Sequence, residues 1–306
     1  MADDSIQIEV VSWNLQRETL RSIRDKVFIE EQKVPREIEW DDHDDTATHF
    51  LVSRNTIALA CGRLLPDGKV GRMAVLREHR GKGLGRQLLD YMIQHARHNG
   101  VGRLYLHAQT HALDFYLDAG FQTFGDEFEE AGIPHAAMEL HIDFQGADEF
   151  ITGVRYPEPF ATLALELAKT ARRSIRIYSA ELDREVFDNR EMASAITNLA
   201  KRGRHSEVRI LINDAKPMVK QGHQLLSLVR RLSSTISIRV LDEHPELPDA
   251  SFVLRDNNGT VYKPDERGRP GFYEPDSRAS AKRFIEQFDA LWRWGEVDPR
   301  LRLLRL

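Results

Sequence analysis

A glycine-rich turn between an apolar run and an amphipathic helix is the feature that most constrains this chain. Its six residues are Arg80, Gly81, Lys82, Gly83, Leu84 and Gly85. Residues 73–76 before it are apolar like a buried strand, and residues 84–95 after it repeat apolar side chains along one helical face. Glycine lets main-chain N–H groups approach an anion closely, and the positive end of a helix dipole faces that anion. The turn therefore predicts a phosphate-bearing ligand, with Arg86 adding to the cationic reach.

We compare three interpretations of this turn, of which the first two require a particular spacing of residues. A Walker loop places a Lys-Ser/Thr pair after the glycines, but Arg86 and Gln87 follow Gly85 here. A dinucleotide-binding fingerprint needs GxGxxG spacing and an acidic residue on the next strand. These glycines are two residues apart, and residues 103–107 contain no acid. A turn that merely starts a helix stays open as the third interpretation, because short glycine patterns are weak signals.

Four separated segments extend the pattern beyond the turn. They are residues 27–35 (VFIEEQKVP), Arg80-x-x-Gly83-x-Gly85, Phe115-Tyr116-x-x-x-Gly120-Phe121 and residues 127–135 (EFEEAGIPH). In this order they resemble motifs of the GNAT acetyltransferase superfamily, and the first and last resemble its ElaA-like bacterial subgroup. The resemblance covers residues 6 to 142.

The resemblance implies an α/β fold for this half, the GNAT arrangement of a mixed central sheet flanked by helices, with acetyl-coenzyme A as cosubstrate. The main chain of Met73, Ala74 and Val75 would pair with the pantetheine arm like an added strand. The amides of the turn would hold the pyrophosphate, which makes all six turn residues cofactor-binding. Gln109 stands where the family often has Asn, and its amide can serve the same purpose.

Acetyl transfer to an amine needs a held thioester, a neutral amine and a stabilised thiolate. The resemblance implies that Tyr116 contacts the cosubstrate and is the general acid, because the family's tyrosine at this place points its hydroxyl toward the sulfur. An alkylammonium with a pKa of about 10 must also lose a proton. Our candidate for the base is Glu31, near the end of the helix that the spacing of Leu20, Ile23 and Val27 predicts over residues 18–32. Glu127, His107 and an ordered water are the alternatives.

The activity predicted in this way is acetyl-coenzyme A-dependent N-acetyl transfer to a primary amine, by direct attack in a ternary complex. The acidic stretch over residues 37–45 would attract a cationic acceptor such as a polyamine, an aminosugar or a lysine side chain. A solvated loop without that role is the alternative. A second hypothesis is a regulatory or scaffold protein that senses acyl-coenzyme A without turnover. Tyr116 favours the enzyme, because a sensor needs no acid.

The composition of the chain argues against several other classes of protein and of site. A chain of 306 residues suits two domains, and a net charge of −5 with 41% hydrophobic residues indicates a globular protein rather than a general nucleic-acid binder. The 12 histidines are scattered and predict no metal site. Cys61 is the single cysteine, so no internal disulfide can form, and its alternating apolar surroundings favour a packed strand residue. The sequence has no long apolar span and no secretory signal, which predicts a cytoplasmic protein without membrane contact.

Glycines and prolines punctuate residues 143–159 and predict a boundary there. We therefore expect a first domain at residues 1–143, a linker at 144–159 and a second domain at 160–306. Helical and strand patterns alternate in the second half, which is typical of an α/β domain. The expected helices cover residues 160–170, 192–201, 225–232 and 281–292. The expected strands cover residues 174–178, 208–212 and 236–240, followed by a hairpin around Asn257, Asn258 and Gly259.

The order of these elements resembles one half of the phospholipase D-like fold. That family's signature is His-x-Lys-x-x-x-x-Asp, and the matching spacing here is Asp249-x-Ser251-x-x-x-x-Asp256. Without the imidazole no phosphohistidine forms, and without the lysine a phosphoryl group loses its clamp. The resemblance thus implies a catalytically inactive accessory domain, and an unrelated α/β domain is the alternative. Active relatives pair two halves, so we expect a homodimer through this domain.

Overall fold

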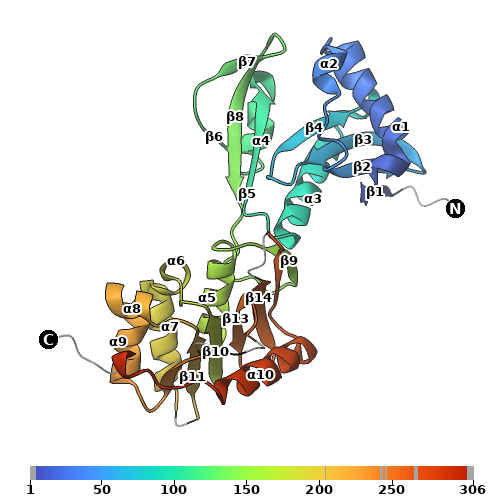
Figure 1. The fold of residues 1–306 in the computed structure, drawn as a ribbon. Coiled ribbons are helices and arrows are strands. Elements are labelled where there is room, and N and C mark those ends of the chain that lie inside the picture. Colours follow the sequence, from blue (N-terminus) through green and yellow to red (C-terminus); the bar gives the residue numbers. More distant parts are fainter. Residues whose placement is uncertain (1–4, 204, 242–243, 245–246, 265–267, 302–306) are drawn as a thin grey trace. The chain divides into compact units, whose positions relative to one another are not determined.

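The computed structural model describes residues 5–301 except 204, 242–243, 245–246 and 265–267. The chain divides into two compact units (Figure 1). The first unit is Met1–Arg97 with Val101–Asp143, and the second is His98–Gly100 with Phe144–Leu306. Each unit has its own sheet and its own buried core.

An antiparallel sheet in the order β1-β2-β3-β4 opens the first unit. Its strands are β1 (Ile6–Val11), β2 (Thr48–Arg54), β3 (Ile57–Leu64) and β4 (Val70–Val75). A tight turn joins β2 to β3, and Asn55 and Thr56 adopt the positive φ that such a hairpin turn requires. Cys61 is buried in β3, where burial raises the pKa of its thiol to about 12. It is therefore a packed strand residue, as the alternating pattern predicted.

The helix expected over residues 18–32 starts earlier and changes type along its length. α1 (Trp13–Arg24) is an α-helix, and the π-helical segment η1 (Asp25–Glu31) continues it. Leu20, Ile23 and Val27 are buried together, as their spacing predicted. A π-helical turn still presents an apolar stripe, so the periodicity could not reveal the change. The short helix α2 (Arg36–Glu39) follows, inside a stretch that we expected to be irregular.

A second small sheet completes the first unit. Its strands are β5 (Arg103–Gln109), β6 (Gln122–Thr123), β7 (Phe128–Glu130) and β8 (Ile133–His141). Both sheets are antiparallel inside, and the isolated bridge between Lys69 and Tyr105 is parallel. Among the described residues this bridge is the one strand-like link between β4 and β5, which then diverge (Figure 1). The helix α3 (Leu84–His98) buries Leu88 and Met92 in the core that both sheets share.

The second unit is built on a mixed seven-stranded sheet in the order β12-β11-β10-β13-β14-β15-β9. Its strands are β9 (Ile151–Val154), β10 (Ser174–Ser179), β11 (Glu207–Ile212), β12 (Ile236–Val240), β13 (Ala250–Arg255), β14 (Gly259–Pro264) and β15 (Gly271–Glu274). β10, β11 and β12 run parallel, and the remaining neighbours are antiparallel. A second α/β domain is therefore present, as the alternating pattern predicted.

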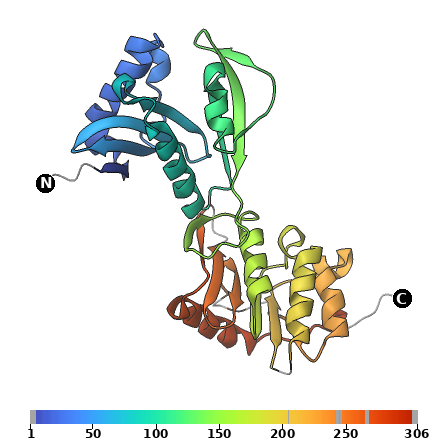
Figure 2. The ribbon, with the colours of Figure 1, turned by 180° about the vertical axis from the view of Figure 1, so that it is seen from behind.

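Helices cover both faces of this sheet. They are α5 (Phe160–Thr170), α6 (Arg184–Phe187), α7 (Arg190–Lys201), α8 (Lys216–Gln221), α9 (Gln224–Arg231) and α10 (Arg278–Trp292). Phe252 and Leu254 of β13 face α10 and pack with Phe284 and Phe288. α5 packs on β13 and β14 from the opposite face, beside α7 (Figure 2). No helix among the described residues is both long enough and apolar enough to cross a bilayer.

Two findings differ from the expectations for the second half. Residues 144–159, expected as a linker, contain β9, which pairs with β15 at the sheet edge. The sequence pattern also missed β15, α6 and α8, which are too short to show a period. Asp249 precedes β13 and Ser251 lies within it, whereas Asp256 lies beyond its other end. Five residue-to-residue steps along the strand separate Ser251 from Asp256, roughly 16 Å. The three positions of the phospholipase D-like spacing therefore do not converge within one strand end.

Candidate functional site

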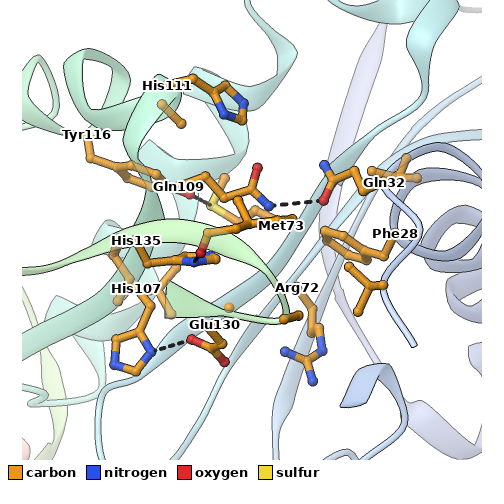
Figure 3. Close-up of a pocket in the computed structure, with 18 of the residues that line it drawn as sticks. Phe28, Gln32, Arg72, Met73, His107, Gln109, His111, Tyr116, Glu130 and His135 are labelled. Carbon is orange, nitrogen blue, oxygen red and sulfur yellow. Dashed lines mark hydrogen bonds and ion pairs between the residues drawn. The ribbon is translucent and has the colours of Figure 1, made fainter. Parts of the chain in front are cut away.

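A pocket of about 460 Å³ opens in the first unit where β4 and β5 diverge (Figure 3). Six residues predicted to contact the cofactor line it: Met73, Val75, Arg80, Gly85, Gln109 and Tyr116. The pocket also contains residues outside that prediction: Phe28, Gln32, Arg72, His107, Glu130 and His135. Ala74 is buried in the sheet, so only its main chain can contribute. The remaining turn residues, 81–84, lie outside the pocket wall at the start of α3.

The pocket-facing edge of β4 is available for main-chain pairing. On its other edge, Ala74 and Val75 pair with Cys61 and Ala60 of β3. Beyond Lys69, no strand among the described residues pairs with the open edge. Such an edge presents unpaired N–H and C=O groups, to which an extended ligand with amides can add as a further strand.

The glycine turn leaves the start of α3 rich in unpaired donors. None of the main-chain N–H groups from 81 to 86 has a hydrogen-bond partner among the described residues, and the next one, of Gln87, donates to the Gly83 carbonyl at 3.1 Å. Gly81 and Gly83 adopt φ of 72° and 79°, values that glycine takes without strain. Free N–H groups at the positive end of a 15-residue helix form an anion site. The turn therefore has the geometry of a phosphate cradle.

The cationic side chains beside this turn are engaged elsewhere. Lys82 Nζ donates to the Glu78 carbonyl at 2.8 Å, and Arg86 Nε pairs with the Asp90 carboxylate at 2.8 Å. Main-chain donors, rather than these two side chains, are therefore the groups already directed at an anion.

Glu31, the residue that we expected to be the base, is held by Arg80. Its two carboxylate oxygens accept hydrogen bonds from Arg80 at 2.6 and 2.8 Å. The hydrogen bond from Arg80 lowers the pKa of Glu31, which makes the carboxylate a weaker proton acceptor. Neither Glu31 nor the alternative Glu127 lines the pocket.

Tyr116 lies in α4 (Leu113–Leu117) and contributes its hydroxyl to the pocket (Figure 3). The hydroxyl donates to the Met73 sulfur at 4.0 Å, and the ring packs edge-on against Phe115 and Phe121. Burial raises the pKa of Tyr116 to about 12, so the phenol keeps its proton at neutral pH. It can therefore donate a hydrogen bond to a developing anion.

Gln109 reaches across the pocket from the end of β5. Its Nε2 donates to Gln32 Oε1 at 3.1 Å, which links β5 to the residue after η1 (Figure 3). Gln32 was not singled out as a site residue, although it lies within the segment 27–35 that carried the resemblance.

His107 and Glu130 form a second pair on the pocket wall (Figure 3). His107 Nδ1 lies 2.9 Å from Glu130 Oε2, and Phe128 contacts the imidazole edge-on at 4.8 Å between ring centres. Burial alone would raise the pKa of Glu130, but the hydrogen bond and charge of His107 lower it, so this carboxylate stays ionised at neutral pH. A carboxylate on Nδ1 holds the proton there and leaves Nε2 free to accept one. His107 is one of the alternative bases that the sequence predicts, whereas Glu130 is not among the predicted site residues although it lies in the segment 127–135.

The acidic stretch at residues 37–45 is not an open negative surface. Three of its six carboxylates pair with three arginines, in the contacts Arg24–Glu39, Arg24–Asp44, Arg63–Asp41, Arg63–Asp44, Arg72–Glu39 and Arg72–Asp41. Glu37, Asp42 and Asp45 stay exposed. The expectation that this stretch attracts a cationic acceptor is therefore wrong for its paired carboxylates, which instead fasten the loop to the sheet.

Two family matches cover the chain. Residues 15–142 match the family described as Acetyltransferase (GNAT) domain. Residues 156–304 match the family described as Domain of unknown function (DUF7931). The resemblance of the second half to a phospholipase D-like fold thus stays a prediction.

Similar proteins align with the first half. The Uncharacterized N-acetyltransferase YjcF of Bacillus subtilis (strain 168) is 35% identical over 120 residues, which are 38% of this chain and 86% of that protein. Protein ElaA of Escherichia coli (strain K12) is 32% identical over 131 residues, 40% of this chain and 86% of that protein. A crystal structure of an Acyl-CoA N-acyltransferase from Pseudomonas aeruginosa is 30% identical and covers 44% of this chain and 99% of that one, with a TM-score of 0.42.

Proposed function

The chain belongs to the GNAT acetyltransferase family through residues 15–142, and from this membership we propose that it transfers an acetyl group from acetyl-coenzyme A to a primary amine. The observation that carries the proposal is a juxtaposition within one unit. An open strand edge at β4 and the Tyr116 hydroxyl line one pocket, and the free N–H groups at the start of α3 lie next to its wall, to which Arg80 and Gly85 contribute. Amides, a pyrophosphate and a thioester sulfur are the groups that these three features suit.

The residues of the pocket fit coenzyme A as a substrate. Gly81 and Gly83 supply main-chain donors for the pyrophosphate, and a side chain at either position would be strained by its positive φ. The main chain of Met73–Val75 supplies donors and acceptors for the pantetheine amides. Arg80 can move from Glu31 toward the phosphates, since both side chains are substantially exposed.

Transfer requires one proton to leave the amine and the C–S bond to break. We assign the first task to His107, whose Nε2 can accept the proton while Glu130 balances the charge of the imidazolium. The amine nitrogen then forms the C–N bond as the thiolate leaves. Tyr116 donates a hydrogen bond to that thiolate. Because its pKa of about 12 exceeds that of a thiol, stabilisation by this hydrogen bond is the larger part of its role.

Glu31 stays the rival for the base, since it could be released if Arg80 turns to a phosphate. His107 is favoured because it lines the pocket and Glu31 does not. The acceptor enters past an apolar rim that includes Phe28, Val34 and Ile38. A primary amine on a partly apolar carrier, or a lysine side chain, suits this rim better than a highly charged polyamine.

The test is release of coenzyme A thiol from acetyl-coenzyme A over a panel that contains spermidine, glucosamine and a lysine peptide. Turnover with one of these supports the enzyme. Calorimetric binding of acetyl-coenzyme A with no thiol release for any amine would favour the sensing alternative. Absence of binding would refute both.

A further inference from the structure

A hollow of about 580 Å³ in the second unit collects four arginines. They are Arg172 and Arg173 before β10, Arg176 within it and Arg278 at the start of α10. The hollow is completed by Asp256, Asn257, Asn258, Ser174 and Ile285. None of this set was part of the phospholipase D-like spacing except Asp256, and Asp249 and Ser251 do not line the hollow.

Three of these arginines have guanidinium groups with no hydrogen-bond or ion-pair partner among the described residues: Arg172, Arg173 and Arg278. All three are exposed. Elsewhere in the unit many arginines are satisfied internally, for example Arg184 by Asp188 and Arg209 by Asp289. Unpaired like charges that gather at one hollow repel one another, and an anionic ligand would remove that cost.

The segment that carries Arg172 and Arg173 is held in place before any ligand arrives. The Asp256 carboxylate accepts hydrogen bonds from the main-chain N–H groups of Arg172, Arg173 and Ser174 at 3.1, 2.7 and 2.9 Å. The Asp256 N–H in turn donates to the Ser174 carbonyl at 2.9 Å. The Asp256 carboxylate is thus hydrogen-bonded to main-chain N–H groups and not paired with an arginine side chain. The side chains of Arg172 and Arg173 therefore extend from a backbone that is already held in place.

The balance of charge also favours an anion in this unit. Residues 144–306 contain 27 Lys and Arg against 24 Asp and Glu, whereas residues 1–143 contain 16 against 24. The hollow itself has four guanidiniums and one carboxylate. Guanidinium forks match phosphate oxygens in bidentate geometry, and a terminal phosphate group carries about −1.5 to −2 charge near neutral pH.

We propose that this hollow binds a phosphorylated small molecule with two or more phosphate groups. A di- or triphosphate balances the surplus positive charge of the lining, and the volume lies within the range of small-molecule sites, about 300–1,000 Å³. The exposed amide of Asn257 adds a further donor at the rim. A nucleic-acid strand fits less well, because the arginines surround one hollow instead of following a stripe.

The test is calorimetric titration of the full chain with inorganic triphosphate. Arg173→Gln with Arg278→Gln should weaken binding about tenfold for each arginine removed. Arg293→Gln is the matched control, since Arg293 is an exposed arginine at the opposite end of α10 whose side chain has no hydrogen bond or ion pair among the described residues, and it should leave the affinity unchanged. Circular dichroism melting checks that the variants fold.

Equal affinity of the wild type and the double variant would overturn the site, as would an equal loss in Arg293→Gln. A single-stranded oligonucleotide that binds more tightly than triphosphate, with the same dependence on Arg173 and Arg278, would overturn the small-molecule assignment. Because the comparison is between variants of the second unit, its outcome does not depend on whether the first unit transfers acetyl groups.

Discussion

At the residue scale, Tyr116 lines the pocket, and its hydroxyl stays protonated at neutral pH. Tyr116→Phe removes that hydroxyl and keeps the ring contacts with Phe115 and Phe121. We expect kcat to fall about 100-fold with little change in the KM for acetyl-coenzyme A, because the lost hydrogen bond forms to the leaving thiolate. Steady-state thiol release measures both constants. Tyr91→Phe, in α3 outside the pocket, is the control, and an equal loss of kcat there would contradict the role.

The pair His107–Glu130 predicts which residue accepts the proton of the amine. His107→Gln should remove most of the rate, because a glutamine amide cannot accept that proton. Glu130→Gln should slow transfer less, because the amide can still hold the imidazole by a hydrogen bond. Steady-state kcat/KM measures both effects. Glu31→Gln should leave kcat/KM largely unchanged, and a loss there as large as in His107→Gln would return the base to Glu31.

At the element scale, the start of α3 depends on the backbone that glycine permits. Gly83→Ala meets open space, with Gln87 Nε2 at 3.8 Å as the nearest atom, yet its φ of 79° is strained for alanine. The turn should therefore shift and weaken acetyl-coenzyme A binding about tenfold, while the fold is kept. Isothermal calorimetry measures the affinity. Gly125→Ala is matched, with φ of 71° and open space on the β6–β7 loop, and binding equally weak in both variants would contradict a phosphate cradle.

Ion pairs hold the loop between α2 and β2 in place, and the lowered pKa of Asp41 predicts how much its ion pairs stabilise the first unit. Burial alone would raise the pKa of Asp41, but Arg63 and Arg72 lower it from 3.8 to about 2. A lowered folded-state pKa contributes stability that is present above pH 3.8 and is lost as the pH falls toward 2. Asp41→Asn should thus cost the first unit about 2 kcal/mol near pH 7 and much less near pH 2.5. Thermal unfolding at the two pH values measures this.

Asp42→Asn is the control for that loss. Asp42 lies next to Asp41 but is exposed, so its replacement should change the melting temperature little. Equal destabilisation by the two substitutions would show that the loop responds to total charge and not to the pairing with Arg63.

Sequence patterns located most elements, and the exceptions have physical causes. Phe160–Thr170 and Ile236–Val240 have the predicted bounds, since their apolar periods are complete. β9, with four residues between Gly146 and Pro157, has no room for a period. In the site, the glycine spacing revealed the turn at α3. The contact of His107 in β5 with Glu130 in β7 joins two strands that both pair with β8, a tertiary approach that no local pattern encodes.

At the scale of the whole molecule, the two units differ in chemistry as well as in fold. The first has the acidic share of the chain and the pocket of a coenzyme A-dependent transferase, and the second has the arginine-lined hollow. Among the described residues, those that line the first pocket all belong to the first unit, and those that line the hollow all belong to the second. We therefore expect each unit to bind its own ligand, acetyl-coenzyme A in the first unit and triphosphate in the second.

Scanning calorimetry can test this expectation, because it measures the unfolding transition of each unit with and without a ligand. Because each unit has its own buried core, we expect two unfolding transitions, and Asp41→Asn should identify the first unit's by lowering it alone. A ligand at 100 times its Kd stabilises the unit that binds it by about 2.7 kcal/mol, which raises a melting temperature by roughly 5–10 °C. Acetyl-coenzyme A should raise the first unit's transition, and triphosphate should raise the other. A single transition that both ligands raise would contradict independent unfolding of the two units, because both sites would then belong to one cooperative structure.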